Sequence, residues 1–265
     1  MRATERAGHR VQAQAQKRLS RDRSRGERGF RYALLNPHLA FCILLHMASV
    51  VALIDGFNMY GALNANVRWK KPFAKYKWIN YWRLMEQYLR PGETLKAVRL
   101  FTAYPEDGMY DWQAKRVRHV LLVDVQRDFG VDITLGRFAR RERQCLVPAS
   151  AGGCGKMFTR HEEKNTDVNI AITLVGLAYE RAYDTALLVT ADGDLITAVD
   201  KAKAAFPRGR IVNIPPIGRF LDARYLAPSV DAQLRMKERH LRSAALPKTL
   251  TLTNGRIVHC PIEWQ

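Results

Sequence analysis

Residues 183–194 read YDTALLVTADGD, and residues 49–55 read SVVALID, so an uninterrupted apolar run leads to an aspartate in both stretches. Apolar runs of this length, rich in β-branched residues, are typical of strands that are covered on both faces. We therefore predict buried strands over 49–54 and 185–190. Each run is followed by an acidic side chain and then by a glycine, as expected where a strand turns sharply.

The rest of the chain alternates between strand and helix patterns around these two strands. This alternation predicts an α/β fold of three layers, with a central, mostly parallel sheet and helices on both faces. The further predicted strands are 95–103, 131–138 and 210–214, and the predicted helices are 73–89, 110–129, 165–181 and 195–205. We predict one domain over 47–228 that contains a polar, cysteine-containing insertion at 139–162.

The C-terminal residues 229–265 are expected to form a small extension. After Pro215-Pro216 the sequence predicts a short helix over 219–226 and a basic helical stretch over 234–245. Two strands, 250–253 and 256–260, flank Asn254-Gly255, which is the strongest short signal for a hairpin with a type I′ turn.

The charge of the chain indicates a polyanionic partner. Ten Lys and Arg against three acids give residues 1–46 a charge of +7, which leaves +11 of the total +18 for the rest. A body that is basic in its own right favours nucleic acid as the partner. We expect residues 1–46 to be a disordered extension, with translation starting at Met47, which an intact mass would test.

Neither a membrane anchor nor a disulfide scaffold is expected. The apolar segment 40–54 is too short to span a bilayer comfortably, and its second half is needed for the first strand. The four cysteines form no dense framework in a chain of 265 residues, which favours a reducing, cytoplasmic setting.

Four aspartates are the candidate catalytic and metal-binding residues. Ligands of open α/β sheets bind beyond the carboxyl ends of the strands, where Asp55, Asp192 and Asp194 fall. Asp167 lies near the start of the helix that precedes the fourth strand. Clustered carboxylates need a compensating cation, and oxygen ligands without histidine favour Mg²⁺ or Mn²⁺. The alternative is that each aspartate only caps a helix or a turn.

These motifs resemble a known family. The strings IDGFNMYGAL, HEEKNTDVNIAITLVGLAYERAYDTALLVTADGDLITAV and RIVNIPP, from about Val50 to Pro216, resemble the NYN domain, the LabA-like branch of the PIN-like nucleases. The tail LPKTLTLTNGRIVHCPIEW resembles the C-terminal extension of bacterial members. The resemblance implies a PIN-like fold, Mg²⁺- or Mn²⁺-dependent RNA cleavage in the bacterial cytoplasm, and a metal site formed by the four aspartates.

Further residues are candidates for binding the substrate. Asn58 belongs to the first motif, and Lys164 belongs to the block before Asp167, to which it would be a neighbour if the helix began that early. Thr190 stands where the family has Ser or Thr, while Ala191 replaces a usual Gly. Arg219 follows the fifth strand and could contact RNA. For each, a turn-forming or solvated surface role is the alternative.

Two other features leave their role open. Cys145, Cys154 and His161 could hold a structural Zn²⁺, although no fourth ligand is evident and free thiols are the alternative. Aromatic residues mixed with lysines over 69–88 could stack on single-stranded RNA or could pack the helix on the sheet.

The sequence thus predicts a metal-dependent endoribonuclease that acts on RNA, preferably single-stranded. A non-catalytic RNA-binding regulatory protein of the same fold is the alternative, and DNA cleavage, homo-oligomers and a regulatory partner protein stay open. A dehalogenase-type phosphatase is disfavoured, because the first strand does not end in Asp-x-Asp-Gly-Thr. A dinucleotide enzyme is disfavoured as well, because no Gly-x-Gly-x-x-Gly loop follows that strand.

Overall fold

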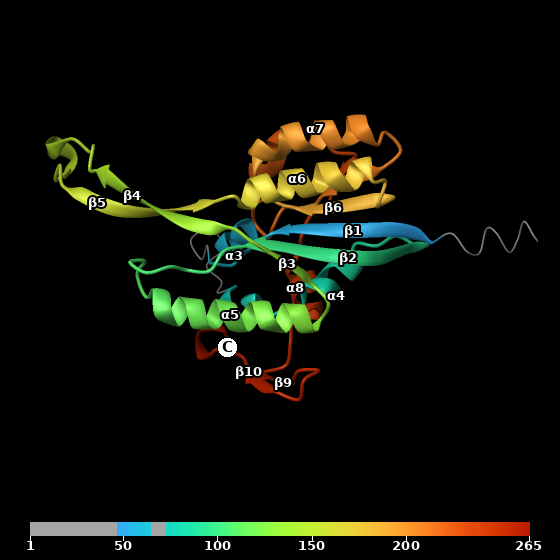
Figure 1. The fold of residues 1–265 in the computed structure, drawn as a ribbon, viewed down its shortest axis with the longest axis horizontal. Coiled ribbons are helices and arrows are strands. Elements are labelled where there is room, and N and C mark those ends of the chain that lie inside the picture. Colours follow the sequence, from blue (N-terminus) through green and yellow to red (C-terminus); the bar gives the residue numbers. More distant parts are fainter. Residues whose placement is uncertain (1–46, 65–72) are drawn as a thin grey trace, which may run out of the picture. The chain divides into compact units, whose positions relative to one another are not determined.

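Strand β1 (Ala48–Asp55) is buried on both of its faces, as its apolar run predicts. Val50, Ala52 and Ile54 face one hydrophobic cluster, while Val51 and Leu53 face a second cluster. Because successive side chains of a strand point to opposite faces, a continuous apolar run fits the centre of a sheet that is covered on both sides. The computed structural model describes residues 47–64 and 73–265 (Figure 1).

Within these residues, six strands form one parallel sheet in the order β3-β2-β1-β6-β7-β8. Strands β1 and β6 are neighbours, with Val50 beside Thr185 and Ile54 beside Val189. The two strands that end in acidic loops therefore end at the same edge. The other strands are β2 (Glu93–Thr102), β3 (Asp132–Leu135), β6 (Thr185–Val189), β7 (Arg210–Asn213) and β8 (Ala232–Gln233).

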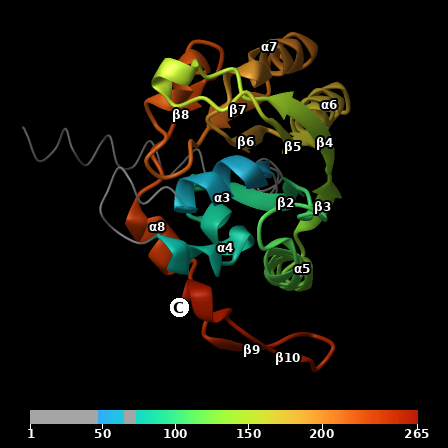
Figure 2. The ribbon, with the colours of Figure 1, turned by 90° about the vertical axis from the view of Figure 1, so that its left-hand side faces the viewer.

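Helices cover both faces of the sheet, which confirms the three-layer α/β fold (Figures 1 and 2). Helices α6 and α7 pack on one face around the second cluster. Helices α3, α4, α5 and α8 lie on the other face. Their bounds are α3 (Gly56–Asn64), α4 (Tyr81–Glu86), α5 (Trp112–Asp128), α6 (Thr166–Tyr179), α7 (Ile196–Ala205) and α8 (Glu238–Ser243).

The predicted helix over 73–89 is wrong as one element. The chain forms a 3-10 turn at Ala74–Lys77 and then the short helix α4. Between them, Ile79 bridges to Ala245, and the Gln126 side chain accepts from the Tyr81 N–H at 3.0 Å and donates to the Ile79 carbonyl at 2.7 Å. These long-range partners replace the hydrogen bonds that a continuous helix would make.

The aromatic residues of this segment that the structure describes pack against the core. Trp78 and Tyr81 are 2% and 3% exposed, and Trp82 packs against the cluster on this face. Lys77 is buried as well, with its ammonium group 4.2 Å from the ring centre of Tyr60. The packing alternative therefore holds for these side chains, while Trp69 lies outside the described residues.

The predicted strand over 131–138 is two strands that meet at Gly136. Strand β3 ends at Leu135, and β4 (Arg137–Gln144) leaves the sheet to pair with β5 (Met157–Lys164) in an antiparallel ribbon. A Cβ atom at Gly136 would lie 2.7 Å from the Lys164 carbonyl oxygen, so only glycine fits between the two strands. The polar insertion is thus a β-ribbon, which projects beyond the edge at which β1 ends (Figure 1).

The C-terminal residues pack onto the α/β domain and do not form a separate extension. Strand β8 lies beyond the expected boundary at residue 228 but pairs with β7 in the central sheet. Only residues 222–225 of the expected helix over 219–226 are helical, as a 3-10 turn, and α8 covers 238–243 of the stretch over 234–245. A hairpin of β9 (Thr249–Thr251) and β10 (Ile257–His259) packs below α5 (Figure 1).

The predicted type I′ turn of this hairpin is wrong. Gly255 has a φ of +81°, but Asn254 does not adopt a positive φ, which a type I′ turn requires at both central residues. The Gly255 N–H bonds to the Leu252 carbonyl at 2.9 Å, and the Leu252 N–H bonds to the Arg256 carbonyl. This pattern is that of a three-residue loop closed by a glycine bulge.

Within residues 47–64 and 73–265, no helix is both long enough and apolar enough to cross a membrane.

Candidate functional site

Asp55 ends β1 and is almost fully buried, with 1% of its surface exposed. Its Oδ1 accepts the Asn58 N–H at 2.9 Å, which caps the start of α3, and its Oδ2 accepts the Thr190 hydroxyl at 3.0 Å. Burial raises the pKa of Asp55, while the hydrogen bonds from Asn58 and Thr190 lower it. The carboxylate is therefore fixed in one orientation beneath the edge of the sheet.

Hydrogen bonds join the loop after β6 to Asp55. The Thr190 hydroxyl also accepts the Asp192 N–H at 3.1 Å, and the Asn58 side-chain carbonyl accepts the Ala191 N–H at 3.2 Å. Asp192 in turn accepts the Asp194 N–H at 3.0 Å, which caps the short turn that begins there. Thr190 and Asn58 thus position the acidic residues that follow both strands.

Asp167 lies in the first turn of α6, and the charges of the other acidic residues act on it. Its pKa is raised to about 6, first by desolvation and then by the charges of Asp55, Asp192, Glu163 and Asp194. Because neighbouring negative charges disfavour ionisation, this shift indicates that the carboxylates lie close enough to repel one another. The four predicted aspartates therefore lie within the range of electrostatic repulsion at one edge of the sheet.

Glu163 is an acidic member of this group that the sequence analysis missed as a site residue. It lies near the end of β5, where its Oε1 accepts the Thr166 N–H at 3.0 Å and also the Thr166 hydroxyl. The sequence signal that could have indicated Glu163 is a Glu three residues before the Thr at which a helix starts. Glu163 therefore fixes the start of α6 and adds a fifth negative charge beside Asp167.

Lys164 does not neighbour Asp167 in a helix, contrary to the expectation. It is the last residue of β5, and α6 begins only at Thr166, after Asn165 with a φ of +80°. The Lys164 ammonium lies 3.1 Å from Glu162 Oε2 on the same strand. The chain reversal at Asn165 is the physical reason, because it separates the strand from the helix.

Arg219 lies beside the acidic group. It lines a shallow hollow of about 280 Å³ together with Phe57, Asn58, Ala191 and Asp192. Its Nε donates to Asp222 Oδ2 at 2.6 Å, and the side chain keeps 39% of its surface exposed. A half-exposed guanidinium at the rim of an acidic group is well placed to bind an anion.

The oxygen donors of this group suit a hard divalent cation, and no histidine is among them. As the side chains lie, however, no three His, Cys, Asp or Glu residues of the described part of the chain are arranged closely enough to hold a metal ion. Asp192 is instead occupied in capping the Asp194 N–H. The raised pKa of Asp167 remains the observation that fits a compensating cation.

The structure does not bring the predicted zinc ligands together. Cys145 and Cys154 are neighbours at the tip of the ribbon, where hydrogen bonds from Cys154 and Val147 lower the pKa of the Cys145 thiol. His161 pairs with Arg140, five residues from Cys145 along β4 or roughly 16 Å in a strand. His161 bonds to the Asp107 carbonyl instead, at 3.1 Å.

One face of the ribbon is strongly basic. In an antiparallel pair, residues directly opposite share a face, so Arg141 and Arg160 lie side by side. Neither forms an ion pair with any residue that the structure describes. Glu162 is the acid on this face, and it pairs with Arg143 at 2.9 Å and with Lys164. We call this set the basic face: Arg137, Arg141, Arg143, Arg160 and Lys164.

The match to a known protein family covers strands β1 to β6. The family model described as the NYN domain matches residues 49–210. The chain belongs to the NYN domain family. This confirms the resemblance seen in the sequence and places the chain in the PIN-like nuclease superfamily. Superfamily members are generally nucleases, so membership indicates a nuclease-like, RNA-related function.

The other comparisons add little to the NYN assignment. A crystal structure of a protein of unknown function from Vibrio parahaemolyticus aligns with a TM-score of 0.44 and 15% identity. The alignment covers 73% of this chain and 96% of that one. No curated protein matches the chain.

Proposed function

We propose that this NYN protein is a metal-dependent endoribonuclease that hydrolyses phosphodiester bonds of RNA at the aspartate group. The observation that carries the proposal is the placement of Asp55 and Asp192 at one edge of the sheet, where the Thr190 hydroxyl bonds to both residues. Carboxylates that repel one another cost stability, and carboxyl groups with strongly raised pKa values are concentrated at functional sites. The family supports a nuclease as that function.

In this proposal, Asp55, Asp167, Asp192 and Asp194 would hold Mg²⁺ or Mn²⁺. When bound, such an ion activates water and stabilises negative charge on a phosphodiester. Asn58 and Thr190 act as positioning residues, because each holds the Asp55 carboxylate and the backbone after β6 in register. Capping hydrogen bonds alone do not explain the group, because Asp167 faces four other acidic side chains.

Cations around the acidic group would bind the substrate. Arg219 lines the hollow beside Asp192 and would contact a phosphate close to the cleaved bond. The basic face of the ribbon would bind the RNA backbone further along the strand. Like charges directly opposite each other destabilise a sheet, so Arg141 and Arg160 favour a polyanion as the missing partner.

The decisive experiment is cleavage of a labelled single-stranded RNA by the purified full chain, with Mn²⁺ or with EDTA. Asp192→Asn is the test variant. Asp200→Asn is the matched control, because Asp200 is exposed on α7, away from the group. Cleavage that needs metal, disappears in Asp192→Asn and persists in Asp200→Asn would support the proposal.

Two other outcomes would contradict the proposal. RNA that binds but is not cut with either metal would favour the non-catalytic regulatory alternative. Cleavage that persists in Asp192→Asn at the wild-type rate would mean that the catalytic centre lies elsewhere. A DNA strand of the same sequence, run in parallel, would test whether the protein selects RNA.

A further inference from the structure

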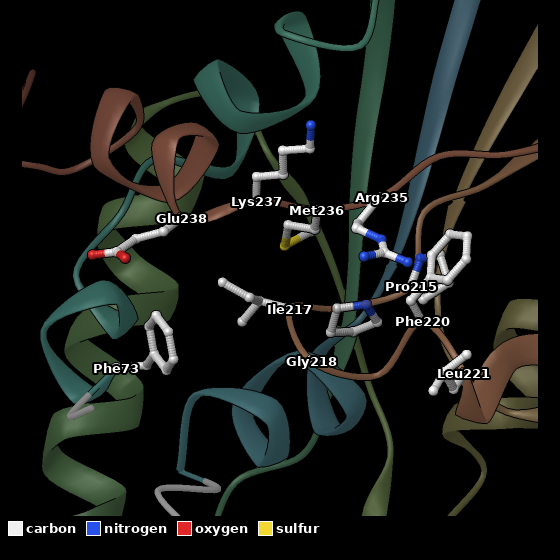
Figure 3. Close-up of a pocket in the computed structure, with 11 residues that line it drawn as sticks. Phe73, Pro215, Ile217, Gly218, Phe220, Leu221, Arg235, Met236, Lys237 and Glu238 are labelled. Carbon is white, nitrogen blue, oxygen red and sulfur yellow. The ribbon is translucent and has the colours of Figure 1, made fainter. Parts of the chain in front are cut away.

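A second cavity lies close to the acidic hollow, at the ends of β7 and β8. Its volume is about 510 Å³, within the range of sites that bind small ligands. Phe73 forms one side, while Phe220 and Leu221 form the other, with Ile217 and Met236 between them (Figure 3). The lining is therefore mostly apolar, with flat aromatic rings at two sides.

A single loop separates this cavity from the candidate catalytic centre. Residues 215–218 and 220–221 line the cavity, whereas Arg219 between them lines the hollow with Asn58 and Asp192. The Arg219 N–H bonds to the Pro216 carbonyl at 2.9 Å, so a tight turn holds this part of the loop. If a phosphate of an RNA strand binds Arg219, the next nucleotide of that RNA therefore lies at the mouth of the cavity.

The charge at the rim of the cavity suits a nucleotide. Arg235 and Lys237 are exposed there, and the Arg235 guanidinium lies 4.5 Å from the ring centre of Phe220. Glu238 is the acid in the lining, and it already accepts the Tyr76 hydroxyl at 2.8 Å and pairs with Arg242. The free charge at the rim is therefore positive.

We propose that this cavity binds one unstacked nucleobase of the RNA strand whose backbone passes over Arg219. The proposal rests on the proposed function and adds a subsite to it. Single-stranded nucleic acids bind where aromatic rings stack on bases beside cations that hold the backbone, and this cavity offers both. Such a subsite favours single-stranded over paired RNA, because a paired base is not free to enter.

The test measures binding in EDTA, so that it does not depend on cleavage. Fluorescence anisotropy would compare single-stranded RNAs that each carry one abasic position, moved stepwise along the strand. We expect wild-type affinity to fall roughly five- to hundredfold at one position, the range for loss of one base–aromatic stack. Phe220→Ala should bind the intact RNA that much more weakly, and the abasic position should then have no further effect.

Two variants control for folding and for general loss of an aromatic side chain. Phe220→Tyr keeps the ring and should bind as the wild type does. Tyr179→Ala removes an exposed ring at the end of α6, remote from the cavity, and should also bind normally. Thermal unfolding of each variant would show that the fold is retained.

The outcomes separate this proposal from the proposed function. Equal binding by Phe220→Ala and the wild type, with no sensitive abasic position, would overturn the base subsite while metal-dependent cleavage could still be present. Tighter binding by Phe220→Ala would overturn it as well, because it would indicate a competing occupant such as a segment of this chain. A wild-type protein that binds no RNA in EDTA would overturn the base subsite, and one that also cuts no RNA with Mn²⁺ would overturn the proposed function.

Discussion

Replacing Asp167 by Asn should stabilise the metal-free protein at pH 7. A carboxyl pKa raised from the ordinary 3.8 to about 6 means that the ionised form costs about 3 kcal/mol in the folded state. Asp167 is half-exposed, so solvent screening reduces this cost to roughly 1–2 kcal/mol. The negative charge of Asp167 also interacts favourably with the N-terminus of α6, and this interaction offsets up to about 1 kcal/mol of the cost. We expect a net gain of about 1 kcal/mol.

This gain should appear as a rise in Tm of roughly 2–4 °C in EDTA, as expected for a body of this size. The folded state holds the Asp167 proton more tightly than the unfolded state does. Wild-type stability therefore falls as pH rises from about 4 to 6, and the two proteins should converge near pH 4. Scanning calorimetry at pH 4 and pH 7, with Asp200→Asn as the exposed control, would measure this. A Tm of Asp167→Asn below that of the wild type at pH 7 would contradict this prediction.

Three other predictions concern the metal, the pH and the basic face. Mn²⁺ should bind more tightly at pH 7 than at pH 5, because Asp167 must lose its proton to bind the ion, and a pH-independent affinity in a calorimetric titration would contradict this. Mn²⁺ at a hundred times its Kd should stabilise the wild type by about 2.7 kcal/mol and Asp192→Asn by much less, measured by calorimetry. Neutralising three arginines of the basic face should weaken RNA binding about 50-fold at 0.15 M salt and lower the salt slope by about 2, since each phosphate contact contributes a slope of about 0.7. The variant carries Arg137→Gln, Arg141→Gln and Arg160→Gln. A control of equal charge change, which should keep the slope, carries Lys96→Gln, Lys201→Gln and Arg208→Gln.

The parts of the fold that the sequence predicted well are those dictated by burial. The apolar runs of β1 and β6 predicted a sheet that is covered on both faces. The helical periodicity of α5 and α6 predicted the bounds of these two helices to within a few residues. The helix over 73–89 failed because its backbone bonds to Gln126 and to Ala244, both far away in sequence. Helix α3 was missed because Gly56 directly after Asp55 indicated a sharp turn at the end of the strand.

The candidate site was predicted as a set of positions but not as a set of contacts. Asp55, Asp192 and Asp194 follow strands, so the topology of the sheet alone brings them to one edge. Glu163 was missed because it lies on a ribbon whose pairing with β4 no local pattern shows. The cavity beside Arg219 was missed for a similar reason, since its two aromatic sides are 147 residues apart in the chain.

The acidic group and the basic ribbon are explained best when they are considered together. Acidic side chains face one another around Asp167, and on the ribbon Arg141 lies opposite Arg160 without an acid between them. Each arrangement is unfavourable by itself, because like charges repel at short range. In the proposed function, a divalent cation would compensate the first arrangement, and the phosphates of an RNA strand would compensate the second. A small acidic metabolite would compensate only a few of these positive charges, because the basic face extends along two strands. A metal site that works on a long polyanion satisfies both arrangements at once, and the base cavity beyond Arg219 extends the same path by one nucleotide.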